Sequence, residues 1–210
     1  MWKHPVLIAA LLLLGAAMPW QEGATAARTT PIQAGGPSLA GQLLVATPEL
    51  DDPNFRHSVV YMVEHNDQGA VGVVINRVLG PAPLGKLLQR LGIVEGADSK
   101  TEIQVHLGGP VQLDQIFVLH SPDYRRDDPF VVDDLAAISF TPDALKDIAV
   151  GHGPRNSLLG FGYAGWGAQQ LENEIAQGSW FAIEADEALL FDDAIATKWQ
   201  RALALRGFDL

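Results

Sequence analysis

The stretch that decides the fold of this chain is His57-Ser-Val-Val-Tyr-Met-Val-Glu-His-Asn-Asp-Gln-Gly-Ala-Val-Gly-Val-Val-Ile-Asn76. Two apolar runs flank the turn-type residues from Asn66 to Gly69, and this pattern predicts a β-hairpin. Valine and isoleucine fill the runs because branched side chains pack well on a pleated sheet. Gly69 supplies the positive φ that such a turn needs. We therefore expect a hairpin in a central part of a sheet.

Short apolar runs, separated by glycine and proline, outline the other elements. Leucines at 84, 87, 88 and 91 have helical spacing, and Gly92 follows them as a helix end. Strands outnumber helices, and the chain shows neither strict βαβ alternation nor an internal repeat. We predict an α+β fold: a single domain with a twisted or coiled mixed β-sheet and several short helices. Strands are expected at 41–47, 103–107, 115–120, 130–132, 137–140, 157–163 and 179–183, and helices at 84–91, 141–150, 166–177 and beyond 192.

Composition narrows the classes of function. The 210 residues include 14 Lys and Arg against 25 Asp and Glu, which gives a net charge of −11. Binding to the phosphate backbone requires clustered cations, so we expect no nucleic acid among the partners. The chain has no cysteine, which removes disulfides, thiolate catalysis and cysteine-based metal sites. No nucleotide-binding or metal motif is present, and we expect no cofactor.

The first 26 residues have the pattern of a secretory signal peptide. Lys3 and His4 precede an uncharged apolar run over 5–17, and Ala24-Thr25-Ala26 offers small residues for cleavage. The run is short for crossing a bilayer, which takes about 20 residues. Residues 27–40 are expected to be a flexible lead-in, and 41–210 the folded domain. An uncleaved membrane anchor and a start codon placed too far upstream stay open as alternatives.

Polar residues at the hairpin ends form the first candidate ligand-binding site. Glu64, His65, Asn66 and Asn76 are expected to gather at one end of the hairpin. Such a group could bind a ligand or move a proton, because histidine titrates near neutral pH. The competing interpretation is turn chemistry, in which these side chains bond to nearby backbone.

Gly165, Trp166 and Gly167 form the second candidate site. We expect them to open a helix whose N-terminus could hold an anion or the carboxylate of a peptide. Alternatively, the glycines here and in Gly108-Gly109-Pro110 permit close backbone approach in a coiled sheet. Neither stretch has the spacing of a phosphate-binding loop.

Two strand histidines, His106 and His120, raise the possibility of a divalent metal site. No metal-binding spacing such as H-E-x-x-H supports that possibility. We expect these histidines to be satisfied by backbone groups instead, and we expect no metal.

Four blocks of the sequence resemble the AlgH/YqgE family of bacterial proteins. They lie within residues 41–54, 56–76, 107–120 and 162–180, in the order of that family. The resemblance implies one α+β domain built on coiled sheets, without an established activity and usually in the cytoplasm. Two sites depart from the family pattern, since Gln115-Ile116 replace a frequent Arg-Gly and Gln169 replaces a frequent glycine. An anion site that used the family's arginine is therefore in doubt here.

Three functional hypotheses follow. The first is a non-enzymatic binding or regulatory module that recognises a protein or small ligand through a polar cleft. The alternative is an enzyme of unknown reaction, with its site at Glu64, His65 and Asn76. The third is a transcriptional regulator, which the acidic charge and the missing helix-turn-helix pattern disfavour. We expect an exported, periplasmic protein without stable membrane association after signal cleavage; a cytoplasmic location is the alternative.

Overall fold

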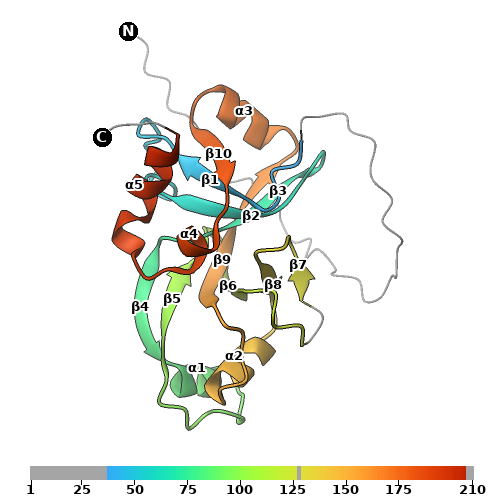
Figure 1. Cartoon of the computed structure of the whole chain (residues 1–210), viewed down its shortest axis with the longest axis vertical. Helices are drawn as coiled ribbons and strands as arrows, with labels where there is room; N and C mark the ends of the chain where they lie inside the picture. The colour runs from blue at the N-terminus through green and yellow to red at the C-terminus, as the bar shows by residue number, and fades with distance from the viewer. Residues whose placement is uncertain (1–36, 127–128, 207–210) are drawn as a thin grey trace. The chain divides into compact units, whose positions relative to one another are not determined.

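The computed structural model describes residues 37–126 and 129–206 (Figure 1). The predicted signal peptide and the first part of the predicted lead-in lie outside these residues. Within the described residues, no helix has the length and apolar character needed to cross a membrane.

Strands and short helices make up an α+β domain, as predicted. The strands are β1 (Gln42–Ala46), β2 (Val59–Asn66), β3 (Gly69–Val74), β4 (Val78–Pro83), β5 (Glu102–Leu107), β6 (Val111–His120), β7 (Phe130–Val131), β8 (Ala137–Ser139), β9 (Ser157–Gly167) and β10 (Trp180–Glu184). The helices are α1 (Leu84–Arg90), α2 (Asp143–Ala149), α3 (Gln170–Ala176), α4 (Glu187–Phe191) and α5 (Ile195–Leu205).

The strands form one curled sheet in which β9 is the central connection (Figure 1). The main path runs β10-β1-β2-β3-β9-β6-β8-β7, and the β4–β5 pair joins through β5 to β9. The β5–β9 pair is parallel, and the other described pairs are antiparallel. The mixed sheet predicted from the sequence is therefore present. Register shifts within the β2–β3, β4–β5 and β6–β9 pairs favour its curvature, because bulges increase local twist.

The predicted hairpin consists of β2 and β3, and it lies inside the sheet. Asn66 pairs with Gly69 at its tip, and Val60 pairs with Val74 toward its base. Gly69 has the expected positive φ of 141°. A Cβ at this glycine would stand 2.2 Å from the carbonyl oxygen of Trp166, so the neighbouring strand also requires a glycine here.

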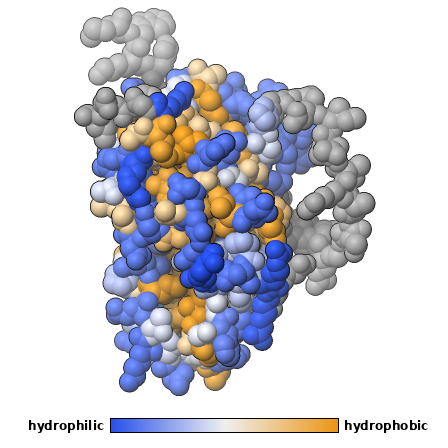
Figure 2. Space-filling model, viewed as in Figure 1, coloured by the Kyte–Doolittle hydropathy of each residue, from blue (hydrophilic) through white to orange (hydrophobic). Residues whose placement is uncertain are grey.

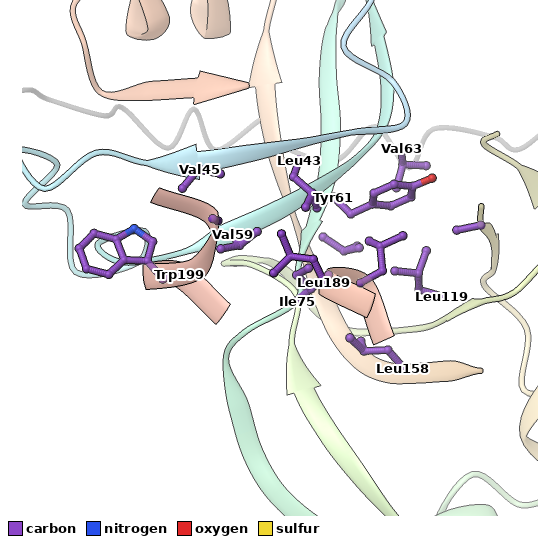
Figure 3. Close-up of a cluster of buried hydrophobic side chains, with 14 of the residues drawn as sticks. Leu43, Val45, Val59, Tyr61, Val63, Ile75, Leu119, Leu158, Leu189 and Trp199 are labelled. Atoms are coloured by element: carbon purple, nitrogen blue, oxygen red, sulfur yellow. The ribbon is translucent and has the colours of Figure 1, made fainter. Parts of the chain in front are cut away.

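Two apolar clusters hold the sheet to its helices. In the first, α4 and α5 pack their leucines and Trp199 against side chains of β1 and β2 (Figure 3). In the second, α1 and α2 pack against β5, β6 and β9. Each fully buried large aliphatic side chain contributes about 1.5–3 kcal/mol relative to exposure. Hydrophobic burial therefore explains why helices of only five to eleven residues keep their places.

Figure 2 shows apolar residues gathered in patches in the upper half and the lower part of the visible face, with polar residues around and between them. The most exposed large apolar residues are Leu79 on β4, Val94 in the loop after α1, Leu113 on β6 and Leu205 on α5. Scattered apolar exposure of this kind is ordinary on a protein surface.

Three local predictions were wrong or incomplete. No strand was predicted at 78–83, where Pro81 and Pro83 interrupt the chain, yet these residues form β4, which pairs with β5 alone. Proline is tolerated there because an edge strand has backbone groups without a ladder partner. The five-residue α4 was not foreseen. The helix expected from Trp166 begins only at Gln170, because β9 continues to Gly167.

Two glycines of the glycine-rich stretches, Gly108 and Gly160, allow a neighbouring side chain to pack closely against the backbone. This was the alternative to a phosphate-binding loop. A Cβ at Gly108 would lie 2.5 Å from the Phe117 ring, and one at Gly160 would lie 2.3 Å from it. The missing side chains make room for this buried ring between neighbouring strands.

Candidate functional site

At the tip of the hairpin, polar side chains form hydrogen bonds within the turn. The Asn66 side-chain amide donates to Glu64 Oε1 at 2.6 Å, while its Oδ1 accepts from the backbone N–H of Gln68 at 2.8 Å. These contacts are the local side-chain hydrogen bonds typical of asparagine in turns. Glu64 and Asn66 thus support the turn.

His65, also at the tip, ties the hairpin to two distant segments. Its Nδ1 accepts from the N–H of Leu39 at 3.1 Å, and its Nε2 lies 2.9 Å from Glu172 Oε1 on α3. Since the first contact requires a bare Nδ1, the ring is the neutral tautomer that donates from Nε2 to the carboxylate. The side chain is only 9% exposed. Both ring nitrogens are therefore used in holding the fold.

Gly165, Trp166 and Gly167 lie within β9, where they pair with Val71, Ala70 and Gly69 of β3 in turn. They consequently reach the same end of the sheet as His65, which pairs with Ala70. The helix N-terminus expected at this place is absent, because α3 starts after the left-handed residue Gln169 (φ 60°). A residue with a Cβ pays for this φ, whereas glycine would adopt it at little cost.

Trp166 instead belongs to a buried cluster centred on Glu174. Its indole N–H donates to Glu174 Oε2 at 3.0 Å, and the indole of Trp180 donates to the same oxygen at 2.9 Å. The Gln170 amide donates to Oε1 at 2.9 Å. Phe55 packs on both indoles, with ring centroids 6.1 and 5.6 Å apart. We call this the Glu174 cluster; its carboxylate is buried and has three donors.

Asn76 lies at the opposite end of the hairpin from the other three candidates, so the expectation that all four converge is wrong. The register explains the error, because Asn66 is at the tip whereas Asn76 follows β3 at the base. The Asn76 side chain accepts from Val59 N–H at 2.8 Å and donates to the His57 carbonyl at 2.8 Å. Glu64, His65 and Asn76 therefore do not form one catalytic site.

The base of the hairpin opens into a pocket of about 300 Å³ whose lining includes two arginines and a histidine. Residues from the two strand ends face the first turns of α5 across it. We call it the arginine pocket; its lining consists of Arg56, His57, Asn76, Arg77, Ile195, Ala196, Trp199 and Gln200.

His57 and Trp199 shape one wall of the arginine pocket. Their ring centroids are 4.1 Å apart, and the Trp199 indole N–H donates to the carbonyl of Ala46 on β1 at 2.8 Å. His57 has a positive φ of 57°, an unusual conformation for a residue with a Cβ. Such a backbone costs about 1–2 kcal/mol. The Asn76 amide that holds the His57 carbonyl helps to keep this conformation in place.

Arg77 supplies the best-anchored positive charge in the arginine pocket. Its Nη1 donates to the carbonyl of Pro53 at 3.1 Å, and its Nη2 donates to the carbonyl of Arg56 at 3.2 Å. Burial, followed by the like charge of Arg56, lowers the pKa of Arg77, and Asp52 opposes this change. A bound anion would relieve the repulsion between the two arginines.

The N-terminus of α5 adds further donors to the same pocket. Its N-cap is Ala194, which has no side chain to cap the first-turn N–H groups, and the next two residues line the pocket. The positive end of the helix dipole favours an anion at this place.

Of the predicted site residues, only Asn76 reaches the arginine pocket. Arg56, His57, Arg77 and Trp199 were missed. A signal was present in the sequence: basic residues stand immediately before the first hairpin strand and after the second. Antiparallel pairing brings those two positions together at the base, so the hairpin prediction already contained this juxtaposition.

The two buried strand histidines do bond to backbone, as expected. His120 Nδ1 donates to the Ser121 carbonyl at 2.9 Å, and its Nε2 lies 3.1 Å from Ser139 Oγ. His106 Nδ1 donates to the Leu159 carbonyl at 3.2 Å. Among the described residues, no three His, Asp or Glu side chains are grouped closely enough to hold a metal ion.

Residues 43–210 match the AlgH-like family. A UPF0301 protein of Methylococcus capsulatus is 42% identical over 183 residues, which cover 87% of this chain and all of that protein. A UPF0301 protein of Thioalkalivibrio sulfidiphilus is 43% identical over 173 residues, covering 82% of this chain and 92% of the relative.

Solved structures show the same fold. The solution structure of the AlgH protein from Pseudomonas aeruginosa has a TM-score of 0.69 and 38% identity, and the match covers 85% of this chain and 94% of that one. A crystal structure from Corynebacterium diphtheriae has a TM-score of 0.63 at 18% identity over 83% of this chain and 90% of that one. The second likeness concerns the fold alone.

Proposed function

The chain belongs to the AlgH-like family, and from this premise we propose that it is a binding module that captures a small anion in the arginine pocket. The observation that carries the proposal is the convergence of two arginines, a histidine and a helix N-terminus on one cavity. In a chain of net charge −11, such a concentration of positive charge works against the overall field. A recognition role accounts for it.

Two kinds of donor make the pocket suited to a phosphate or carboxylate group. Guanidinium groups present N–H donors in a planar fork that matches these anions. Only two of the five N–H groups of Arg77 are needed for its bonds to Pro53 and Arg56, so others are available to a ligand. The Gln200 amide and the free helix N–H groups complete a donor-rich lining.

The proposal assigns binding rather than a reaction. The described lining of the arginine pocket contains no Ser, Thr, Lys, Asp or Glu. His57 therefore has neither a nucleophile to activate nor a carboxylate to orient it within this pocket, which nucleophilic and general base catalysis usually require.

Titration with inorganic phosphate tests the proposal. We expect saturable changes in the NMR signals of the Trp199 indole and of the amides at 195 and 196, because these groups line the pocket. High ionic strength should weaken the binding. Arg56→Gln should weaken it about tenfold, since a charged hydrogen bond contributes about 1.5 kcal/mol or more.

Arg90→Gln is the matched control, because it removes the same charge from an exposed position on α1. It should leave phosphate binding within about twofold of the wild type, since distant surface charges are screened. Equal effects of the two substitutions, or the absence of saturable binding by the wild type, would overturn the proposal.

A further inference from the structure

Residues 37–41 lead into β1 and lie against the tip of the hairpin; we call them the entry segment. Its attachment there involves His65 twice. The Ser38 hydroxyl donates to the carbonyl oxygen of His65 at 3.0 Å, and the Leu39 N–H donates to the ring Nδ1 at 3.1 Å. The second bond depends on the protonation state of the ring, because Nδ1 can accept only while it carries no proton.

The two nitrogens of the His65 ring respond differently to a second proton. The side chain is only 9% exposed, and Nε2 lies 2.9 Å from Glu172 Oε1. In the imidazolium form both nitrogens are donors. Nε2 then keeps its carboxylate acceptor, whereas the new N–H at Nδ1 faces the N–H of Leu39. Protonation therefore breaks one contact of the ring and retains the other.

The charged groups on the elements around the His65 ring are acidic. Glu172 and Glu174 belong to α3, and Glu174 is held by the indoles of its own cluster. At the hairpin tip, Glu64 is bonded within the turn and Asp67 is exposed. The hairpin, α3, β9 and the entry segment contribute no Lys or Arg. No cation on these elements therefore opposes protonation of the ring.

Gly41 limits how far a change at His65 can spread along the chain. Its N–H donates to the carbonyl of Met62 at 2.9 Å, and neither partner titrates. From Gln42 onward, β1 pairs with β10, and it pairs with β2 from Leu43. The part of the entry segment whose attachment depends on His65 is therefore 37–40.

From these contacts we propose that acid releases the entry segment from the hairpin tip, with His65 as the pH-sensitive group. The neutral ring holds Leu39 through Nδ1. When the ring takes up a proton from solvent, the Leu39 N–H loses its acceptor and meets a second donor, while the imidazolium stays bound to Glu172. Residues 37–40 then leave the tip, and β1 remains in the sheet. This switch does not depend on the proposed anion site at the base of the hairpin.

Amide hydrogen exchange at about pH 8 and about pH 5, on either side of the histidine range, tests the proposal. Protection factors remove the intrinsic effect of pH on exchange. The protection of the Leu39 amide should fall about fivefold or more in acid, because it loses one hydrogen bond. The Gly41 amide should keep its protection, which separates local release from general unfolding. The NMR signals of the His65 ring should follow the same pH course as the Leu39 amide.

A variant separates the acceptor from its titration. In His65→Asn, the side-chain oxygen can replace Nδ1 as acceptor for Leu39, but the amide gains no proton in this pH range. The protection of Leu39 should then no longer change with pH. His152→Asn is the matched control, because it removes an exposed histidine from the loop after α2, and it should behave as the wild type does.

Three results would overturn the proposal: equal protection of the Leu39 amide at both pH values in the wild type, a pH response that persists in His65→Asn, or a response that disappears in His152→Asn. If His65→Asn does not fold, the wild-type protein decides. Protection of Leu39 that does not follow the His65 ring signals, or that falls together with that of Gly41, refutes the assignment.

Discussion

The two ends of the central hairpin are equally rich in polar residues, but they use them differently. At the tip, His65 has partners for both ring nitrogens, and Asn66 uses both its amide and its oxygen. At the base, Arg56 is exposed, and its side chain has no hydrogen bond to the described residues. Arg77 beside it keeps N–H groups to spare. The polar groups at the tip therefore stabilise the fold, whereas those at the base remain available to a ligand.

This difference separates polar residues that serve the fold from those that remain available. A crowd of polar side chains in a sequence does not by itself indicate a site, because turns and strand ends also need them. The useful criterion is whether donors and acceptors are already satisfied inside the molecule.

Among the substitutions that test this difference, Glu174→Ala at the tip end should have the largest effect on the free energy of unfolding. Loss of the carboxylate leaves the buried indole N–H groups of Trp166 and Trp180 without their acceptor. Each unsatisfied buried group costs about 1–3 kcal/mol, so we expect the free energy of unfolding to fall by about 2–5 kcal/mol. Urea denaturation followed by tryptophan fluorescence measures it. Glu172→Ala is the control, since that carboxylate is 51% exposed; a similar loss in both variants contradicts the assigned role of Glu174.

His65→Ala tests whether the tip is purely structural. It removes one backbone hydrogen bond and a half-exposed contact to Glu172, so the free energy of unfolding should fall by about 1–2 kcal/mol. Phosphate affinity should stay unchanged, because His65 is at the other end of the hairpin from the arginine pocket. Calorimetric titration of the folded variant checks this, and a large loss of phosphate affinity would erase the distinction between the two ends.

The two buried histidines, His106 and His120, make the stability of the protein depend on pH. Burial is the main cause that lowers the pKa of both His106 and His120 below the ordinary 6.5. Below pH 6.5 the unfolded chain therefore binds protons that the folded chain refuses, and stability is lost as the pH falls toward the folded pKa values.

Denaturation midpoints at a series of pH values above and below 6.5 measure this loss. Replacing His106 by Asn should make the decline less steep, because one of the two histidines no longer titrates. A decline of unchanged steepness would show that His106 does not contribute.

The smallest expected effect comes from two of the three non-glycine residues with positive φ in the described part of the chain: Gln169, near the tip, and His57, at the base. Gln169→Gly should raise the free energy of unfolding by about 0.5–1 kcal/mol, because the φ of 60° costs glycine little. His57→Gly relieves the strain of a similar φ but loses the ring packed on Trp199. The free energy of unfolding should therefore rise by less than in Gln169→Gly, and phosphate binding should weaken. Thermal denaturation of the two variants compares them; an equal gain in both would mean that the His57 ring contributes nothing.

Much of the fold was readable from local pattern. Alternating and β-branched runs predicted β1, the hairpin, β5, β8 and β10, and leucine spacing predicted α1. The prolines of β4 hid an edge strand, because only tertiary placement shows which strand lacks a partner on one side. The extension of β9 through Trp166 was missed for a similar reason, since its pairing with β3 outweighs the local glycine signal.

The sequence by itself determined the α+β class, the hairpin and the acidic balance of this protein, because periodicity, turn residues and composition act over short distances. It also contained the basic residues on either side of the hairpin. Only the tertiary structure decided which polar groups were left over. The partners of His65 are 26 and 107 residues away, and the partner of His106 is 53 residues away. Their satisfaction therefore depends on contacts that no local pattern encodes.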